Sequence, residues 1–209
     1  GMKVLVTYYS QTGNTEKVAR AIYEAVTAQK EMKPVAQAAA AGYDLVFCGF
    51  PVQAHSVPGK MAEFVKGLPK GQKTAFFATH GSLRGGQLPR QAFESAAGLA
   101  AHLKVLGQFG CRGKVDQKVI DALMKKPEHK AWAEEALGAV GNPDAADLRD
   151  AAGSLPAQAW DVAVFNPPYR KVGSGRVNPQ AQKALARHEI AGTVADFLEA
   201  ASRALKPGG

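Results

Sequence analysis

Hydrophobic residues in the first half of the chain fall into short continuous runs, and amphipathic stretches lie between them. Continuous apolar runs rich in β-branched residues are typical of strands that are buried on both faces of a parallel sheet. These runs predict strands at 3–8, 43–50, 73–79 and 105–111, with a weaker strand near 32–36. Helical spacing predicts helices over 16–29, 58–68 and 87–103, the second of which opens at a proline.

Strands that alternate with helices at this spacing indicate a parallel sheet covered by helices on both faces. From 117 to 153 the pattern is helical and alanine-rich, with a turn and helix start at 142–144. The character changes at 154–156, where a new apolar run at 160–165 is followed by two helical stretches. We therefore predict an α/β domain over 1–155 and a β-α-α appendage over 156–209.

Composition fits an ordinary globular protein, with 46% hydrophobic and 21% charged residues. No apolar run is long enough to span a membrane, and the first residues run directly into a strand, so we expect no signal peptide and a cytoplasmic protein. The net charge of +8 is scattered along the chain, which indicates a solvated surface and makes nucleic acid an unlikely partner. Cys48 and Cys111 have no metal-ligand or CxxC spacing, so we expect reduced thiols in or near the core.

Polar and small residues fill the loop between the first predicted strand and the first predicted helix. Hydroxyls, an amide and backbone N–H groups at a helix N-terminus suit a phosphate group, and a glycine lets the backbone approach the anion. The loop has neither the Walker A pattern nor G-x-G-x-x-G, which argues against a triphosphatase and a dinucleotide fold. An ordinary helix cap is the alternative. The residues of this first loop are Ser10, Gln11, Thr12, Gly13, Asn14 and Thr15.

Two further loops leave the carboxyl ends of predicted strands, where open α/β sheets bind their ligands. The second loop, 50–57, offers an aromatic ring, an amide and an imidazole. The third loop, 79–86, is rich in glycine and can present backbone groups to the edge of a planar ring.

The opening sequence MKVLVTYYSQTGNTEKVARAI resembles that of flavodoxins, and the run LGQFGCRGKVD with the tail NPDAADLRDA resembles a short-chain bacterial subfamily. The resemblance covers about 150 residues. It implies a three-layer sandwich with a five-stranded parallel sheet in the order 2-1-3-4-5, FMN as the cofactor and redox proteins as partners. It also implies that the first loop holds the FMN phosphate and that residues of the other two loops lie against the isoalloxazine ring. The implied ring contacts are Phe50, Pro51, Val52, Gln53, Thr79, His80, Gly81 and Gly85.

This sequence departs from the family pattern in two ways. Residues 1–155 carry a net charge of +5, whereas flavodoxins are usually acidic, which argues against the usual basic redox partners. The third loop lacks the tyrosine that commonly stacks on the flavin, which leaves Phe50 or His80 as substitutes. We hypothesise that His55 or His80 contacts the ring and raises its potential; the alternative for each is a solvent-facing loop histidine.

A second motif, Asn166-Pro167-Pro168-Tyr169, follows the predicted strand at 160–165. An Asn amide, a proline carbonyl and a tyrosine ring can together recognise an exocyclic amine on a base. The surrounding run is similar to bacterial tRNA adenine-N6 methyltransferases over about 50 residues. No glycine-rich S-adenosylmethionine loop precedes it in this sequence, so we interpret 156–209 as an incomplete methyltransferase-like segment. A segment this small needs a surface to dock on, and we expect the flavodoxin-like domain or a second copy of the chain, giving a homodimer.

The sequence therefore predicts an FMN-binding electron carrier with no catalytic residue and no metal site of its own. One alternative is an FMN-dependent NAD(P)H quinone or nitro reductase. The other is a fragment of a fusion with a tRNA methyltransferase.

Overall fold

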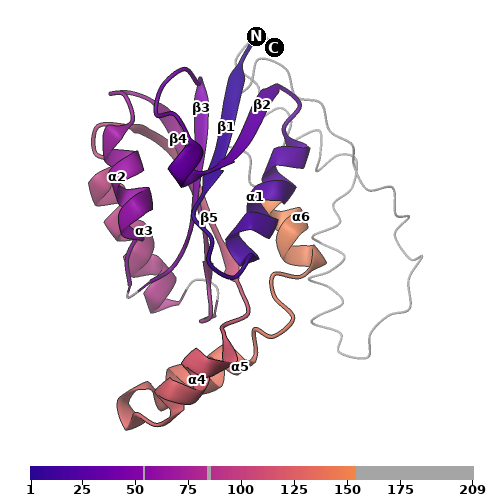
Figure 1. The fold of residues 1–209 in the computed structure, drawn as a ribbon, viewed down its shortest axis with the longest axis vertical. Coiled ribbons are helices and arrows are strands. Elements are labelled where there is room, and N and C mark those ends of the chain that lie inside the picture. The colour runs from indigo at the N-terminus through magenta and orange to yellow at the C-terminus, as the bar shows by residue number, and fades with distance from the viewer. Residues whose placement is uncertain (54, 84–85, 154–209) are drawn as a thin grey trace, which may run out of the picture. The chain divides into compact units, whose positions relative to one another are not determined.

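The structure is a computed structural model that describes residues 1–53, 55–83 and 86–153. In this part of the chain five parallel strands form one sheet in the order β2-β1-β3-β4-β5, which confirms the predicted fold class and strand order (Figure 1). The strands are β1 (Lys3–Tyr8), β2 (Gln29–Pro34), β3 (Leu45–Pro51), β4 (Lys73–His80) and β5 (Lys104–Arg112). Their carboxyl ends lie at one edge of the sheet because all neighbouring strands are parallel.

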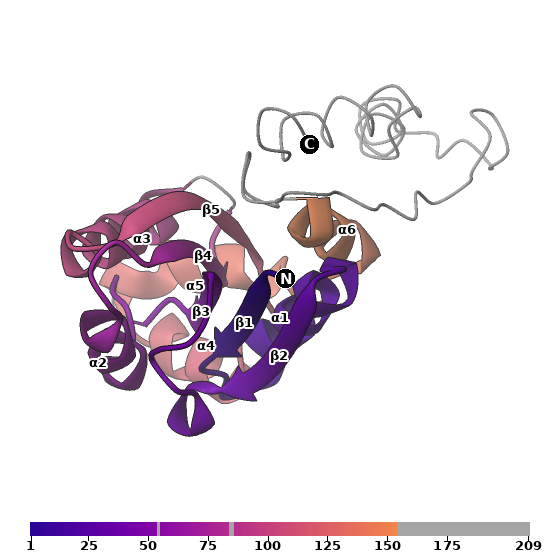
Figure 2. The same ribbon diagram turned by 90° about the horizontal axis from the view of Figure 1, so that it is seen from above.

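Helices cover both faces of the sheet, with α1 and α6 on one face and α2 and α3 on the other (Figure 2). A helical hairpin, α4 and α5, follows β5 and extends from the carboxyl edge (Figure 1). None of the described helices is long and apolar enough to cross a membrane. The α-helices are α1 (Asn14–Ala25), α2 (Gly59–Gly67), α3 (Gln87–Leu99), α4 (Gln117–Met124), α5 (Lys130–Leu137) and α6 (Ala145–Gly153), and the 3-10 helices are η1 (Val35–Gln37) and η2 (Pro127–His129).

The face of the sheet under α2 and α3 packs into a continuous apolar core. Three aromatic rings meet there edge to face, since the Phe50 centroid lies 6.5 Å from that of Phe76 and 6.2 Å from that of Phe93. Cys48 belongs to the same core, and burial raises the pKa of its thiol. Cys48 and Cys111 are both buried and neither forms a disulfide, which confirms the expected pair of reduced thiols in the core.

The sequence places the end of the first helix and the start of the second strand too late. Helix α1 ends at Ala25 because Val26 is already extended, and the Lys30 ammonium donates to the carbonyls of Tyr23 and Val26 at 2.7 Å each. Strand β2 begins at Gln29 and reads QKEMKP, without the apolar run that marks the central strands. Because β2 is an edge strand, pairing with β1 and polar contacts hold it in place of deep burial.

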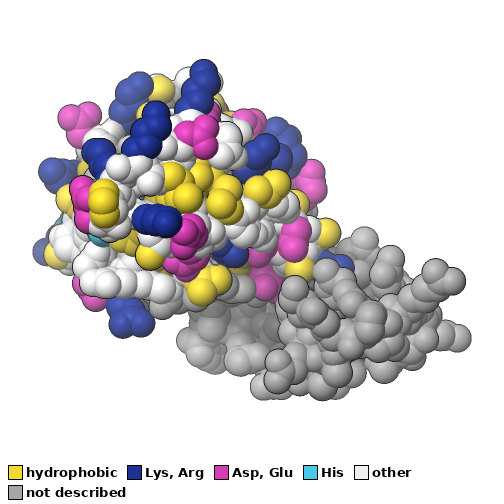
Figure 3. Space-filling model, turned by 90° about the horizontal axis from the view of Figure 1, so that it is seen from below, with side chains coloured by type: hydrophobic (Ala, Val, Ile, Leu, Met, Phe, Trp, Pro, Cys, Tyr) yellow, Lys and Arg dark blue, Asp and Glu magenta, His cyan; other side chains and the backbone are white. Residues whose placement is uncertain are grey.

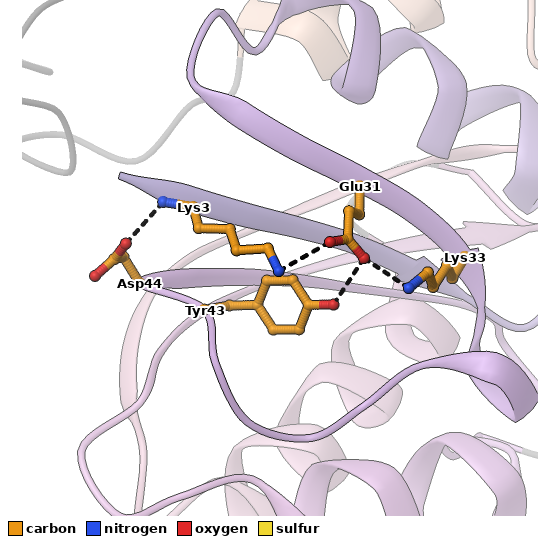
Figure 4. Close-up of polar contacts among 5 residues, drawn as sticks. All are labelled: Lys3, Glu31, Lys33, Tyr43 and Asp44. Atoms are coloured by element: carbon orange, nitrogen blue, oxygen red, sulfur yellow. Dashed lines mark hydrogen bonds and ion pairs between the residues drawn. The ribbon is translucent and has the colours of Figure 1, made fainter. Parts of the chain in front are cut away.

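Glu31 of β2 is the centre of the polar contacts at this edge (Figure 4). Its carboxylate pairs with Lys33 at 2.6 Å and with Lys3 at 2.9 Å, and it accepts a hydrogen bond from the Tyr43 hydroxyl at 3.0 Å. Lys33, then Lys3 and then Tyr43 lower the pKa of the Glu31 carboxyl from 4.5 to about 2.

Glu31→Gln is expected to remove a stabilising contribution that depends on pH. Because the folded chain favours the carboxylate, this contribution is complete above pH 4.5 and is lost as the pH falls to about 2. Urea unfolding should show the wild-type chain as the more stable at neutral pH, with the gap closing on acidification. Solvent screening keeps the gap small, because 31% of the Glu31 side chain is exposed. Glu63→Gln, at an exposed position on α2, is the control, and an equal pH dependence in both variants would contradict the assignment.

Helix α6 begins as the sequence predicts, at the turn over 142–144. The Asp144 carboxylate accepts from the backbone N–H groups of Ala146 and Asp147 at 2.9 Å, and the Asp147 carboxylate accepts from Asp144 N–H at 2.9 Å. This reciprocal capping fixes the start of α6, which then packs along α1 (Figure 2).

Candidate functional site

The three predicted loops meet at the carboxyl edge of the sheet. The Gln53 side-chain amide donates to the Gln11 side-chain carbonyl at 2.8 Å, which joins the second loop to the first. The Thr15 and Thr79 hydroxyls share a buried hydrogen bond of 2.8 Å, which joins the first loop to the third. The sheet topology therefore brings together the three loops that were predicted from the sequence to form a ligand site.

The first loop turns sharply at Gly13 to start α1. Gly13 has a φ of +89°, which is the left-handed region where only glycine is free of strain, and its N–H donates to the Ser10 hydroxyl at 3.1 Å. No side chain caps α1, so the first N–H groups of the helix are left without an intrahelical or side-chain acceptor in the described structure. This helix start is a set of backbone donors at the positive end of a helix dipole.

The side chains of this loop do not all converge on one point, contrary to the expectation from sequence. The Thr15 residue is only 1% exposed and its hydroxyl is bonded to Thr79. The Asn14 amide donates to the Lys114 carbonyl at 2.9 Å and lies within 3.4 Å of the Thr12 hydroxyl. An anion at this loop would therefore rely on backbone N–H groups and on Thr12 more than on Asn14 or Thr15.

In the second loop, the prediction that the Phe50 side chain flanks the flavin ring is wrong. The Phe50 residue is fully buried in the core beneath α2 and α3, so its ring is not presented at the sheet edge. Pro51 and Val52 are half-buried, and Val52 N–H donates to the Thr79 carbonyl at 2.9 Å. His55 is exposed in a left-handed turn with φ +66°, and its Nδ1 lies 2.8 Å from the Gln91 side-chain oxygen.

In the third loop, His80 is not the solvent-facing residue that one interpretation of the sequence expected. It is 5% exposed, and its Nδ1 donates to the Ser82 carbonyl at 2.8 Å. A carbonyl only accepts, so Nδ1 carries the proton. Gly81 follows at the sheet edge, whereas Gly85 lies outside the described residues.

A fourth segment, which the sequence did not single out, completes this edge of the sheet. Gly113 N–H donates to the His80 carbonyl at 2.8 Å, and Lys114 N–H donates to the Asn142 carbonyl at 2.9 Å. Arg112, the last residue of β5, donates to the Gly81 carbonyl at 3.2 Å. The position of Arg112 directly after a predicted strand was the available signal, by the same rule that selected the other loops.

A groove of about 480 Å³ lies between the first loop and the base of the hairpin. Its lining combines two lysines, one aspartate, three side-chain amides, one hydroxyl and a small apolar wall. The lining residues are Thr12, Asn14, Lys17, Lys114, Val115, Asp116, Gln117, Val140, Gly141, Asn142 and Pro143. Viewed from this edge, hydrophobic side chains gather at the centre with charged side chains of both signs around them (Figure 3).

The second motif of the sequence, Asn166-Pro167-Pro168-Tyr169, lies outside the described residues. Within the described ranges, no group of three or more His, Cys, Asp or Glu side chains is placed to hold a metal ion.

Comparison with known proteins identifies similar chains. The family model described as a flavodoxin domain matches residues 5–155. The chain is 31% identical to the flavodoxin-like domain-containing protein BilS of Clostridioides difficile (strain CD3) over 120 residues, which are 54% of this chain and 68% of that protein.

Two solved structures are also similar to this chain. A flavoprotein from Lactobacillus acidophilus NCFM in complex with FMN is 18% identical, with 58% of this chain and 98% of that chain covered and a TM-score of 0.44. A WrbA-like flavodoxin from Agrobacterium tumefaciens is 17% identical, with 66% and 99% covered and a TM-score of 0.45.

Proposed function

Because this chain belongs to the flavodoxin domain family, we propose that it binds FMN at the carboxyl edge of its sheet and carries electrons through the flavin. The observation that carries the proposal is the start of α1, where Gly13 turns the backbone and no side chain caps the helix in the described structure. Unpaired N–H groups at a helix N-terminus are a common phosphate site in α/β proteins.

The residues around this helix start fit a phosphate group. The Ser10 hydroxyl accepts from Gly13 N–H and so fixes the loop, while Thr12 is exposed beside the helix start. Lys17 and Lys114 line the adjoining groove, and their positive charge favours a phosphate dianion. These groups would bind and orient the phosphate end of FMN.

The second and third loops would hold the ring end of the cofactor. Pro51 and Val52 offer half-buried apolar surface, and the third loop offers backbone groups at Gly81. His55 stays a candidate for contact with the ring, whereas the contacts of His80 with Ser82 hold its imidazole inside the protein. When bound, FMN supplies the redox chemistry, and the protein supplies binding, orientation and electrostatics.

Gly13→Ala is expected to weaken the binding of FMN about tenfold and to leave the binding of riboflavin unchanged. A left-handed L-residue costs about 1–2 kcal/mol, and relief of this strain would move the backbone donors away from the phosphate. Riboflavin has no phosphate, so its affinity reports only the ring site. Fluorescence titration of the cofactor-free chain with FMN and with riboflavin measures both affinities.

Gly42→Ala is the matched control for this experiment. Gly42 has a φ of +95° and, as at Gly13, a new Cβ would meet nothing within 4 Å, but it precedes β3 at the opposite edge of the sheet. The strain is therefore the same, and the ratio of FMN to riboflavin affinity should stay at the wild-type value. A wild-type chain that retains FMN no better than riboflavin would defeat the proposed function.

An electron carrier should not oxidise NAD(P)H by itself. The FMN-loaded chain is expected to consume NADH or NADPH only after a flavodoxin reductase is added. Direct oxidation coupled to a quinone or nitro compound would instead favour the reductase alternative.

Residues 156–209 stay a sequence prediction. The matched family model ends at 155, before the methyltransferase-like motif, and a homodimer through this segment is likewise a prediction. Calorimetry with S-adenosylmethionine tests the methyltransferase alternative, for which we expect no binding.

A further inference from the structure

Arg112 places a positive charge against the backbone of the third loop, at the Gly81 carbonyl. It is the last residue of β5, it is half-buried, and its Nη2 donates to two backbone carbonyls, that of Gly81 at 3.2 Å and that of Glu135 at 2.5 Å. No carboxylate oxygen among the described residues lies within ion-pairing distance of the guanidinium, and its buried Nε has no acceptor there. Among the described residues, the charge is therefore bound to neutral groups and has no direct ion pair.

The side-chain carboxylate of Glu135, whose backbone carbonyl Arg112 holds, is engaged with the third loop. Glu135 Oε1 accepts from Leu83 N–H at 2.7 Å, two residues beyond the carbonyl that Arg112 holds. Arg112 thus binds the third loop at a backbone carbonyl, and Glu135 binds it at a backbone N–H group. The loop conformation is set by the α4–α5 hairpin as well as by the sheet.

Close packing at Gly81 makes this attachment specific. A Cβ at Gly81 would lie 2.4 Å from Val115 Cγ2 and 3.5 Å from both Trp132 Cζ2 and Ala136 Cβ. The hairpin therefore packs directly against the loop backbone, with no side chain at position 81 to separate them.

A positive charge at this loop would act on a flavin bound there. Reduction adds negative charge to the flavin ring, and a guanidinium close to the ring stabilises that charge.

We propose that Arg112 is a positioning residue that fixes the third loop and raises the reduction potential of the bound flavin. This inference rests on the proposed FMN site. It assigns to Arg112 the role that the sequence had suggested for His55 or His80.

The test is a reductive titration of the FMN-loaded full-length chain, with reference dyes that report both one-electron midpoint potentials. Arg112→Gln should shift the equilibrium of the second electron about tenfold toward the oxidised side, which is a fall of about 59 mV. Arg112→Lys keeps the charge and should keep most of the wild-type potential. Lys104→Gln removes the same charge from the exposed amino end of the same strand and should change nothing.

Several outcomes would overturn the inference. Equal shifts in Arg112→Gln and Lys104→Gln would show a net-charge effect only, and an Arg112→Lys potential as low as that of Arg112→Gln would remove the role of charge. A shift in His55→Ala without one in Arg112→Gln would return the role to a histidine.

If Arg112→Gln does not bind FMN, Arg112→His is the variant to measure instead. The charge of a histidine can be switched between pH 5 and pH 8, so one variant reports the flavin potential with and without the positive charge. Its potential should then approach that of the wild-type chain only at the acidic end, and a constant gap would count against the inference. A wild-type chain that does not bind FMN defeats the proposed function, whereas a wild-type chain that binds it with potentials unmoved in Arg112→Gln defeats only the role of Arg112.

Discussion

Gly49→Ala is expected to lower the free energy of unfolding by about 3 kcal/mol, the upper part of the range for overpacked cores. Gly49 lies in the middle of the sheet on β3, between Tyr8 of β1 and Phe77 of β4. A Cβ there would lie 2.1 Å from both Cε2 and Cζ of the Phe77 ring, far closer than any carbon atoms pack. Phe77 is 1% exposed, so its ring has no open space to move into. Urea unfolding followed by circular dichroism measures the loss.

The double variant Gly49→Ala/Phe77→Ala separates this clash from other effects of the alanine. Phe77→Ala alone should cost about 3–5 kcal/mol because it leaves a cavity. If the clash is the cause, the new methyl group enters that cavity, and the double variant costs much less than the sum of the two single changes. Additive losses, or a Gly49→Ala loss under about 0.5 kcal/mol, would contradict the argument.

The central strands could be predicted from sequence because their burial determines their composition. The runs at 3–8, 43–50 and 73–79 are apolar on both faces, and each coincides with a strand to within two residues. Strand β2 could not be placed well, since an edge strand held by Glu31 and its two lysines has no apolar run to mark it. The glycine at position 49, inside an apolar run, marks a close approach between residues of neighbouring strands, but not which residue approaches.

The candidate site could be predicted at the level of loops but not of side-chain directions. The rule that ligands bind at the carboxyl ends of parallel strands selected three segments that the structure does bring together. Which face of the sheet Phe50 lies on depends on the pleat of β3, and the sequence does not show that this face is the one covered by α2 and α3. Asn14 is similar, because its hydrogen-bond acceptor is the carbonyl of Lys114, 100 residues away.

The hairpin shows why the fourth segment was missed. Arg112 is placed at the third loop by its hydrogen bonds to Glu135 and Gly81, which lie 23 and 31 residues away along the chain. Helical periodicity over 117–153 predicts helices there, but it does not say that α5 returns to the third loop. A long-range contact of this kind requires the tertiary structure.

Gly81→Ala is expected to destabilise the chain by about 2 kcal/mol and to weaken FMN binding about tenfold. The new Cβ would lie 2.4 Å from Val115 Cγ2, and a valine side chain is too stiff at χ1 to move aside freely. The hairpin and the third loop must therefore separate, which strains the hydrogen bonds of Arg112 to Gly81 and of Glu135 to Leu83. Urea unfolding measures the stability, and fluorescence titration measures the affinity for FMN.

A second-site change at Val115 tests whether this contact is the cause. In Gly81→Ala/Val115→Ala the clashing methyl group is gone, and the remaining neighbours, Trp132 and Ala136, lie at an ordinary contact distance of 3.5 Å. Val115→Ala alone should cost about 1 kcal/mol, a typical loss for a half-buried position. The double variant is therefore expected to bind FMN almost as the wild-type chain does and to be more stable than Gly81→Ala alone. If the double variant bound FMN no better than Gly81→Ala alone, contact with the hairpin would not be what shapes the third loop. The hairpin would then have no part in the cofactor site.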